Sequence, residues 1–371
     1  MDTDFIVIGA GAAGAAAAVA LAAHGRVLLL EAEAQPGYHS TGRSAALYTP
    51  NYGNAAVRAL IAAGRPFFES PPPWIGRPLL AWRGGLGIAG PEAAARFDAT
   101  VALGAADGSI VEIAPEEAVR RVPVLRREPI AFACFEEAIA DIDVAALHHG
   151  LLGRLRALGG AIVCDSPVRG LERRAGRWQV ATASGQHRAP VLVNAAGAWA
   201  DRVAALAGLP GIGLVPKRRT MIVVPCPPGL DTAGWPSVDQ IDNDAYLKPE
   251  TGRLLASPGD ATPCPPGDAQ PEELDVAVAA DWLQRATTLP VARIERRWAG
   301  LRSFVADDTP VVGPDPVAEG FVWLAGQGGY GIMLAPILGE AAAALATGGA
   351  LPQAIREHGL DEAAVGVARL R

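Results

Sequence analysis

The first 31 residues contain the feature that most constrains the fold, a glycine pattern between two apolar runs. The apolar run 4–8 leads into the spacing G-x-G-x-x-G, and an alanine-rich segment follows. A second apolar run then ends at Glu31. A strand, a glycine turn, a helix and a second strand in this order are typical of the unit that binds the pyrophosphate of a dinucleotide. The pattern fits FAD or NAD and does not choose between them.

Each residue of this unit has a physical role. Gly9 permits a tight turn, Gly11 lets the backbone approach a pyrophosphate, and Gly14 lets the helix pack closely on the strand. Ala13 lies in the first helical turn, where free N–H groups face the phosphates. The carboxylate of Glu31 suits ribose hydroxyls and repels a 2′-phosphate, which argues against NADP. The alternative, an alanine-rich core helix after a glycine turn, does not account for the acid.

Composition excludes several classes of protein. The 371 residues suffice for two domains or one interrupted domain, and half of them are hydrophobic. The net charge is −7 and the longest basic run is 217–219, so nucleic acid is not an expected partner. The acidic start does not fit a signal peptide, and the apolar run 12–23 is too short to span a bilayer. Four cysteines without a C-x-x-C pair indicate thiols in the cytoplasm, and the six histidines have no metal-ligand spacing.

Two later segments repeat the strand–turn–helix pattern. The apolar run 191–194 leads into small residues, and 321–325 leads into a glycine-rich turn and a helix to about residue 347. Asn54 and Asp143 are predicted to cap two further helices. The segments between contain short strand-like runs. We therefore predict an α/β fold, with a Rossmann-like dinucleotide-binding domain from 1–70, 141–213 and 290–371, and an interleaved antiparallel α+β substrate domain from 71–140 and 214–289.

With these stretches in view, the chain resembles a known family. The specific segments are 35–46, 191–199, 216–219, 246–249, 298–306, 327–332 and 358–362. They are similar to the FAD-dependent D-amino-acid oxidoreductase (DAO) family, which includes D-amino acid, sarcosine and glycine oxidases, and within it to the bacterial D-arginine dehydrogenases. The resemblance covers nearly the whole chain.

The resemblance implies FAD rather than NAD, bound in an extended form with its ring between the two domains. No cysteine lies in a loop assigned to the ring, so the FAD is expected to be non-covalent. The residues expected to contact it are Gly9, Gly11, Ala13, Gly14, Glu31, Ala32, Ser40, Thr41, Gly42, Arg43, Ser44, Ala45, Ala46, Leu47, Val168, Ala196, Gly197, Trp199, Gly300, Arg302, Gly328, Gly329, Tyr330, Gly331 and Ile332.

The resemblance also assigns a substrate site. Arg302 and Arg219 are expected to clamp a carboxylate, since a guanidinium binds one through two parallel hydrogen bonds. Tyr52, Tyr246 and Gly329 are expected beside the substrate. No side-chain nucleophile is needed, because the cofactor carries the chemistry. The alternatives are an arginine paired to a structural acid, with its neighbour at position 218 as the true clamp, and tyrosines that only pack.

Three positions depart from the family pattern. Leu47 stands where a histidine is usual, the segment 81–87 has no acid, and Met333 replaces a polar residue. A guanidinium buried without a carboxylate is costly. The sequence therefore predicts a more apolar pocket that prefers neutral or apolar D-amino acids to D-arginine.

The expected activity is that of an FAD-dependent D-amino acid dehydrogenase. A D-amino acid becomes an imino acid, which water converts to a 2-oxo acid and ammonia. The electrons pass to an acceptor other than oxygen, a quinone or a carrier, in the cytoplasm or at the inner membrane face. The alternatives are an oxygen-using amine oxidase of the sarcosine or glycine oxidase type, a 2-hydroxy-acid dehydrogenase, and a non-catalytic flavin- or NAD-binding protein.

Overall fold

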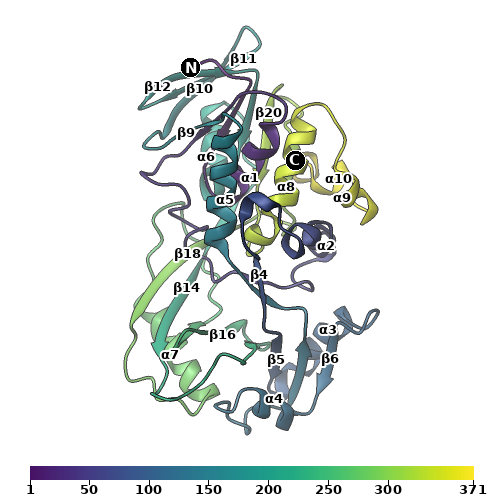
Figure 1. Ribbon diagram of the computed structural model, residues 1–371, viewed down its shortest axis with the longest axis vertical. Coiled ribbons are helices and arrows are strands. Elements are labelled where there is room, and N and C mark those ends of the chain that lie inside the picture. Colours follow the sequence, from purple (N-terminus) through teal and green to yellow (C-terminus); the bar gives the residue numbers. More distant parts are fainter.

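Two large sheets, one above the other in Figure 1, organise the protein, which a computed structural model describes over residues 1–371. The upper sheet has six strands, in spatial order β19 (Val311–Pro314), β20 (Phe321–Ala325), β13 (Val191–Asn194), β1 (Phe5–Ile8), β2 (Val27–Leu30) and β9 (Ala161–Val163). The lower sheet has eight, in the order β18 (Arg296–Phe304), β14 (Val215–Pro225), β17 (Arg253–Ser257), β16 (Ala245–Glu250), β15 (Ser237–Gln240), β5 (Gly85–Ala89), β7 (Phe132–Glu136) and β6 (Ile110–Ile113).

Smaller sheets and helices surround these two. The three-stranded sheets are β10 (Val168–Arg174), β11 (Arg177–Thr182) and β12 (Gly185–Ala189), and β3 (Leu47–Tyr48), β8 (Ala140–Ile142) and β4 (Leu80–Trp82). The α-helices are α1 (Ala12–Leu21), α2 (Ala55–Glu69), α3 (Ala94–Leu103), α4 (Pro115–Arg121), α5 (Val144–Ala157), α6 (Ala200–Leu206), α7 (Glu273–Ala286), α8 (Gly331–Ala346), α9 (Gln353–Glu357) and α10 (Glu362–Val365). Short 3₁₀ turns are η1 (Pro73–Ile75), η2 (Pro91–Ala93), η3 (Gly197–Trp199) and η4 (Val367–Leu370).

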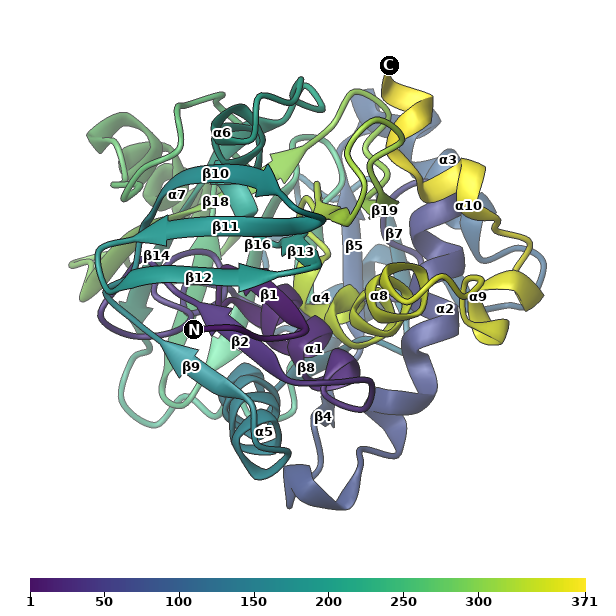
Figure 2. The ribbon, with the colours of Figure 1, turned by 90° about the horizontal axis from the view of Figure 1, so that it is seen from above.

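The six-stranded sheet is buried on both faces. Its strands run parallel except for the edge strand β19. Alternate side chains point to opposite faces, so Val7 and Leu29 pack with α1, α5 and α8, while Ile6 and Leu28 pack with α6 and the sheet β10–β12. In Figure 2, β1 and β2 lie between the β10–β12 layer and the helices α1 and α8. This arrangement confirms the predicted α/β, Rossmann-like fold.

Helix starts follow the predicted caps. The Asn54 side chain accepts a hydrogen bond from the Val57 N–H at 2.9 Å and begins α2. The Asp143 side chain accepts one from the Ala146 N–H at 2.8 Å and begins α5. Both caps satisfy an N–H group that has no partner inside its helix, and both confirm the prediction.

Small residues allow α1 to pack closely against its neighbours. A Cβ added at Gly14 would lie 1.9 Å from the carbonyl oxygen of Gly9. A Cβ added at Gly339 of α8 would lie 2.7 Å from the backbone of Ala16. Helix α1 therefore touches both the strand before it and a helix near the other end of the chain.

The eight-stranded sheet has two different faces. Its strands pair antiparallel except β15 with β5. One face is apolar, with Ile222, Val224 and Leu247 packed against Trp282 of α7. The other face lines a cavity with polar side chains such as Arg219 and Asp239, and it also carries a small apolar cluster that includes Met221. The site lies on this second face.

Strand β18 differs from the predicted domain division. The range 290–371 was assigned to the dinucleotide-binding domain, yet β18 pairs with β14 over nine positions, from Val215↔Phe304 to Val223↔Arg296. Backbone pairing along the whole strand places β18 in the eight-stranded sheet, although β19, the next strand in the sequence, belongs to the six-stranded sheet. The other domain limits stay predictions.

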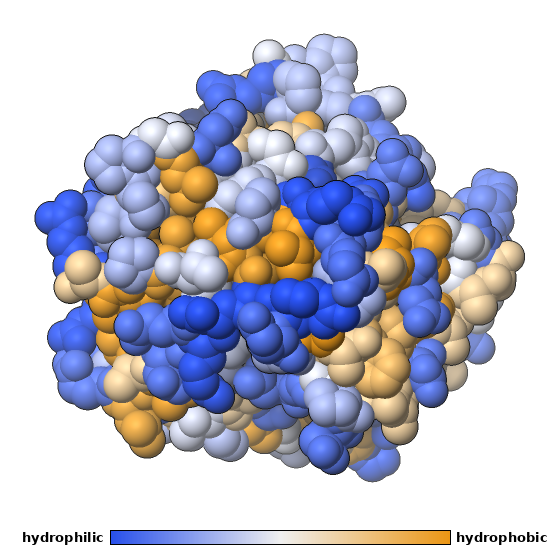
Figure 3. Space-filling model, turned by 90° about the horizontal axis from the view of Figure 1, so that it is seen from below, coloured by the Kyte–Doolittle hydropathy of each residue, from blue (hydrophilic) through white to orange (hydrophobic).

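The outer surface of the lower half carries apolar side chains. In the view from below, apolar residues gather between bands of hydrophilic ones (Figure 3). Leu274 and Val278 of α7 are two exposed apolar residues of this half. Across the whole chain, no helix combines the length and the apolar character needed to cross a bilayer.

Candidate active site

A cavity of about 900 Å³ extends from the glycine turn after β1 to the polar face of the eight-stranded sheet. It gathers residues from the carboxyl ends of β1, β2 and β13, from the loop 37–47 and from the turn 327–331. In parallel α/β sheets, ligands bind outside the carboxyl ends of the strands. All of the predicted cofactor and substrate residues line this cavity except Gly14 and Gly42.

One end of the cavity is shaped by close backbone approaches. Gly9 has φ +100°, and a Cβ there would lie 2.5 Å from the carbonyl oxygen of Ala195. The Thr41 hydroxyl accepts the N–H of Ala12 at 3.0 Å, which ties the loop 37–47 to the start of α1. At this end only a residue without a side chain leaves the backbone accessible, as a pyrophosphate requires.

The carboxylate of Glu31 lies at the end of β2, on the cavity wall. Its two oxygens accept the N–H groups of Ala10 at 2.8 Å and Glu33 at 3.1 Å. These bonds fix the side chain, and the remaining lone pairs can accept ribose hydroxyls.

The strand alternation of β14 separates two neighbouring arginines. Arg218 points to the α7 face, where it forms ion pairs with Asp275 at 2.9 Å and with Glu272. Arg219 points to the cavity. The alternative in which residue 218 is the clamp therefore does not fit, because its guanidinium is already paired on the other face.

Two guanidiniums face the cavity without an acidic partner. The Nε atom of Arg219 is buried without a hydrogen bond. The ion pairs in this region are made by its neighbour Arg218 and not by Arg219. The guanidinium of Arg302 donates one hydrogen bond, to the hydroxyl of Tyr52 at 3.4 Å, and forms no ion pair. Burial and the nearby charge of Arg302 hold the pKa of Arg219 below its ordinary value. An anion placed between the two guanidiniums would offset both the cost of burying Arg219 and its repulsion by Arg302.

Aromatic and glycine residues complete this part of the wall. The buried Tyr246 directs its hydroxyl to the sulfur of Met221 at 3.2 Å. A Cβ added at Gly329 would lie 3.0 Å from the Tyr52 hydroxyl and 3.4 Å from the guanidinium carbon of Arg302. Gly329 thus leaves room for the phenol and the guanidinium to meet.

Two carboxyl groups line the same cavity from neighbouring strands. Asp239 of β15 lies opposite Tyr246 in register, and Glu136 of β7 lies opposite Gly85. Burial raises the pKa of Asp239 to about 6, and Asp244 adds to this while the two arginines oppose it. Burial raises the pKa of Glu136 to about 7.

These two acids lie outside the segment in which the sequence analysis finds none. The segment 81–87 indeed has no acid, but strands on either side of it supply two. The pocket thus contains two acids outside that segment, and the preference for neutral or apolar D-amino acids stays a prediction. Strand register between segments 50 or more residues apart cannot be read from the sequence, so no local signal marked these residues.

Comparison with known proteins identifies the family. The family model "FAD dependent oxidoreductase" matches residues 4–345. The chain belongs to this FAD-dependent oxidoreductase family. Its similarity to curated relatives is moderate: 26% identity over 300 residues to FAD-dependent oxidoreductase domain-containing protein 1 of Bos taurus, with 69% of this chain and 60% of the relative covered.

Two further relatives of this FAD-dependent oxidoreductase have names that describe an activity. Dimethylglycine dehydrogenase of Mus musculus is 28% identical, with 62% of this chain and 28% of the relative covered. Glycine oxidase of Geobacillus kaustophilus is 26% identical, with 60% and 58% covered. The chain thus spans 60% or less of the length of these three curated relatives.

Solved structures show the same fold. The crystal structure of glycine oxidase from Geobacillus kaustophilus aligns with a TM-score of 0.84 at 21% identity, over 94% of this chain and 95% of that chain. L-proline dehydrogenase from P. horikoshii aligns with a TM-score of 0.81 at 22% identity, over 94% of each. The resemblance to D-arginine dehydrogenases in particular stays a hypothesis.

The family confirms FAD as the cofactor of this oxidoreductase, and the cavity fits it. The cradle at Gly9 and Gly11 suits the pyrophosphate, and Glu31 suits the ribose. Cys134 lies on the opposite sheet, and burial raises the pKa of its thiol to about 11, so it stays protonated. The individual contacts of the predicted residues with FAD stay predictions.

Three predicted residues have a structural role in the oxidoreductase. Gly14 packs beneath Gly9, and a Cβ at Gly42 would lie 2.6 Å from the carbonyl oxygen of Gly37. The Arg43 guanidinium pairs with Asp268 and donates to three carbonyl oxygens, of Ala269 at 2.9 Å, Ala299 at 3.1 Å and Tyr38 at 3.3 Å. This guanidinium therefore holds neighbouring loops together, while other atoms of Arg43 line the cavity.

A buried histidine supports the glycine turn. His148 of α5 donates its Nε2–H to the carbonyl oxygen of Ala10 at 2.8 Å. Burial lowers the pKa of His148, so the imidazole is neutral. The six histidines have no metal-ligand spacing in the sequence, and no local signal marks this role of His148.

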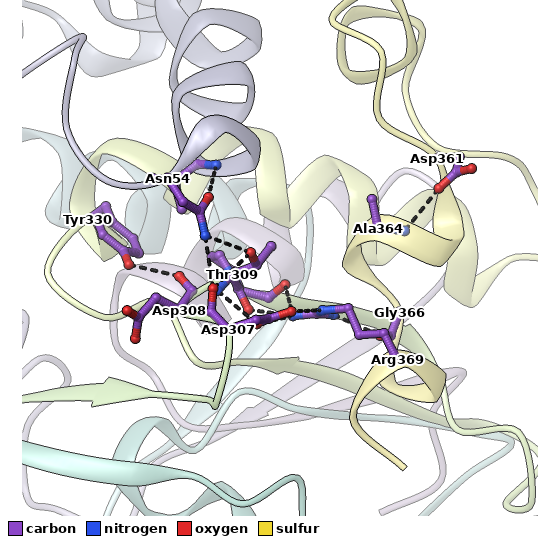
Figure 4. A network of polar contacts seen from close by, with 11 residues as sticks. Asn54, Asp307, Asp308, Thr309, Tyr330, Asp361, Ala364, Gly366 and Arg369 are labelled. Carbon is purple, nitrogen blue, oxygen red and sulfur yellow. Dashed lines mark hydrogen bonds and ion pairs between the residues drawn. The ribbon is translucent and has the colours of Figure 1, made fainter. Parts of the chain in front are cut away.

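A polar network fixes the turn at the other end of the cavity. The Tyr330 hydroxyl donates to the Asp308 carbonyl at 2.8 Å, and Arg369 of η4 donates to the Asp307 carboxylate at 2.8 Å. Asn54 donates to the Asp307 carbonyl and to the Thr309 hydroxyl, each at 2.9 Å (Figure 4). Three distant segments thus hold Tyr330 against the cavity.

Proposed function

We propose that this FAD-dependent oxidoreductase is a dehydrogenase of D-amino acids. The observation that carries the proposal is the pair of cavity-facing guanidiniums, Arg219 and Arg302, neither of which has an acidic partner. Buried charges in proteins are nearly always paired with an opposite charge. Two cations that face a cavity without an acidic partner therefore indicate a site for an anionic ligand. An amino-acid carboxylate supplies one and accepts parallel hydrogen bonds from a guanidinium.

The residues of the chain bind and orient the substrate. Arg219 and Arg302 hold the carboxylate, and the Tyr52 hydroxyl at 3.4 Å from Arg302 limits how that guanidinium turns. Tyr246 covers the substrate from the sheet. When the substrate's carboxylate is fixed by the arginines and its side chain lies along the sheet, the Cα–H bond of the substrate can point in only one direction.

The overall reaction balances without a side-chain nucleophile. Bound FAD supplies the acceptor for a hydride, the Cα–H hydrogen with its two electrons. The amine loses one proton, which leaves an imino acid, and water converts this to a 2-oxo acid and ammonia. The D configuration, the acceptor other than oxygen and the location in the cytoplasm or at the inner membrane face are supported by the family resemblance of the segments 35–46, 216–219 and 298–306.

Anaerobic mixing tests the function. The purified FAD-containing protein is mixed with D- and L-amino acids, and the visible absorbance of the flavin is followed. We expect the absorbance to fall with D-amino acids and to persist with the matched amines that lack the carboxylate. A fall with L-amino acids alone would overturn the stereochemistry, and no fall with any amino acid would overturn the function.

The same experiment examines two alternatives. Similarity to a dimethylglycine dehydrogenase and to a glycine oxidase favours N-substituted glycines such as sarcosine as a second candidate class. Faster reaction with sarcosine than with any D-amino acid would replace the first proposal by this one. On admission of air, a slow return of absorbance fits a dehydrogenase, and a rapid return fits an oxidase.

A further inference from the structure

We propose that Asn51 and Glu136 act as a positioning pair, in which the buried carboxyl of Glu136 anchors the loop 49–53 and so holds the Tyr52 hydroxyl beside Arg302. The proposal deepens the proposed function and rests on it, because Arg302 is there one of the two residues that bind the substrate carboxylate. Asn51 and Glu136 act through Tyr52 and not on the substrate itself. They thereby determine how tightly the substrate is bound.

One side-chain amide connects the loop 49–53 to the eight-stranded sheet. The Nδ2 group of Asn51 donates to the Glu136 carboxyl at 2.9 Å and to the Ser109 hydroxyl at 3.0 Å. Glu136 is on β7, and Ser109 directly precedes β6. An amide nitrogen carries two hydrogens, so Asn51 uses both of its donors on these two partners. The strands β7 and β6 are the last two in the strand order, and the loop is therefore bound at this end of the sheet.

The next residue of the loop contacts the opposite end of the same sheet. The Tyr52 hydroxyl lies 3.4 Å from a guanidinium nitrogen of Arg302, which is on β18, the first strand in the order. Both Asn51 and Tyr52 line the cavity. Because consecutive Cα atoms are only about 3.8 Å apart, a fixed Asn51 closely limits where the Tyr52 side chain can start.

Packing alone does not fix Tyr52. It is 36% exposed, and its ring contacts that of Tyr330 with the centroids 5.5 Å apart. The backbone on either side is restricted instead. Pro50 has a fixed φ, and Gly53 has φ +83°, in the left-handed region. Between these two residues, the Asn51 side chain supplies the hydrogen bonds that tie the loop to the eight-stranded sheet.

Glu136 is suited to this role because it is buried and lies directly against its partner. Only 7% of the residue is exposed. Burial raises the pKa of its carboxyl, and hydrogen bonds from the side chain and the backbone of Asn51 oppose this effect. A buried carboxyl that loses its hydrogen bonds is costly, so the loop is held against the sheet.

Loss of the pair is expected to affect binding more than the reaction. A Tyr52 side chain that moves freely no longer limits how the Arg302 guanidinium turns, so the substrate carboxylate meets a less ordered binding site. The reaction of a substrate that is already bound changes little. A higher KM with a nearly constant kcat is what the loss of such a binding interaction produces.

Kinetics of variants of the FAD-containing protein test the pair, with the amino acid that reduces the flavin fastest as substrate. In Asn51→Ala and in Glu136→Leu, we expect KM to rise about tenfold and kcat to change less than about twofold. Glu136→Gln keeps a carbonyl oxygen that can accept the Asn51 N–H, so its KM is expected to stay within about threefold of the parent value. Glu137→Leu, the same substitution at the exposed neighbouring residue, is the matched control.

The double variant Asn51→Ala/Glu136→Leu distinguishes a pair from two independent residues. If both act through one hydrogen bond, its KM is about tenfold above that of the parent, as in each single variant, whereas independent effects would multiply to about a hundredfold. KM does not depend on the concentration of folded enzyme, so partial loss of folded protein does not affect the comparison. If Glu136→Leu does not fold, Asn51→Ala in its half-buried loop position still decides the outcome.

The results that overturn this inference differ from those that overturn the proposed function. A multiplied effect in the double variant, an unchanged KM in Asn51→Ala, or a fall in kcat without a change in KM would show that the two residues do not position Tyr52. In each of these cases the parent protein still oxidises the amino acid, and the proposed function stands. If no amino acid reacts with the parent protein, the proposed function is overturned and this inference with it.

Discussion

Glu136 is a buried carboxyl whose pKa of about 7 lies above the ordinary value of 4.5. The folded state therefore keeps its proton longer than the unfolded state does, and the contribution to stability is complete below pH 4.5 and lost as pH rises through 7. We expect Glu136→Gln to raise the free energy of unfolding at pH 8 by roughly 2 to 3 kcal/mol and to leave it unchanged at pH 4.

Thermal unfolding without substrate measures this difference, with Glu137→Gln as the control. A Glu136→Gln variant that is less stable than the parent protein at pH 8 would contradict the prediction. A gain in stability would mean that the natural residue weakens the fold, as groups retained for binding often do.

Gly329 tests the substrate end of the cavity. A Cβ there would lie 3.0 Å from the Tyr52 hydroxyl, so Gly329→Ala pushes the phenol or the Arg302 guanidinium out of place. We expect KM for the amino acid to rise about tenfold, with little change in the melting temperature. Gly153→Ala in α5 is the control, because a Cβ at Gly153 meets nothing within 4 Å. Equal KM values in the two variants would show that the crowding has no effect.

At the scale of elements, Asn54 joins a helix start to two other segments. Its side chain caps α2 and also donates to the Asp307 carbonyl and the Thr309 hydroxyl (Figure 4). We expect Asn54→Ala to lower the free energy of unfolding by about 1 to 2 kcal/mol, through the lost cap and the lost loop contacts. Ser70→Ala at the other end of α2, where the side chain is exposed, is the control in denaturant unfolding. A loss equal to that of the control would contradict the role of the network.

Strands with strong local signals could be predicted, and strands that depend on their neighbours could not. The apolar runs 191–194 and 321–325 form β13 and β20 within the predicted limits. The glycine-rich β5 and the short β15 were missed, because glycine and polar residues disfavour a strand until adjacent strands pair with it.

At the scale of the whole molecule, the sequence predicts the cofactor end of the site, but it predicts the substrate end only in part. The glycine turn and Glu31 belong to one continuous unit of 31 residues, so their spacing predicts their geometry. The roles of Arg219 and its neighbour Arg218 differ because successive side chains of one strand point to opposite faces of the sheet. Asp239 and Glu136 meet the arginines only through the order of eight strands from five parts of the chain, which a single sequence does not reveal.

The packing of α1 against α8 has a consequence for how the chain is made. Helix α1 ends at Leu21 and α8 begins at Gly331, so a ribosome adds roughly 310 residues between them. Strand β1 lacks β13 until residue 194 has been added, and the alanine-rich helix has an uncovered apolar flank until α8 has been made. The cavity at the glycine turn also includes residues 327–333 in its wall, so its wall is complete only when synthesis of the chain is almost finished.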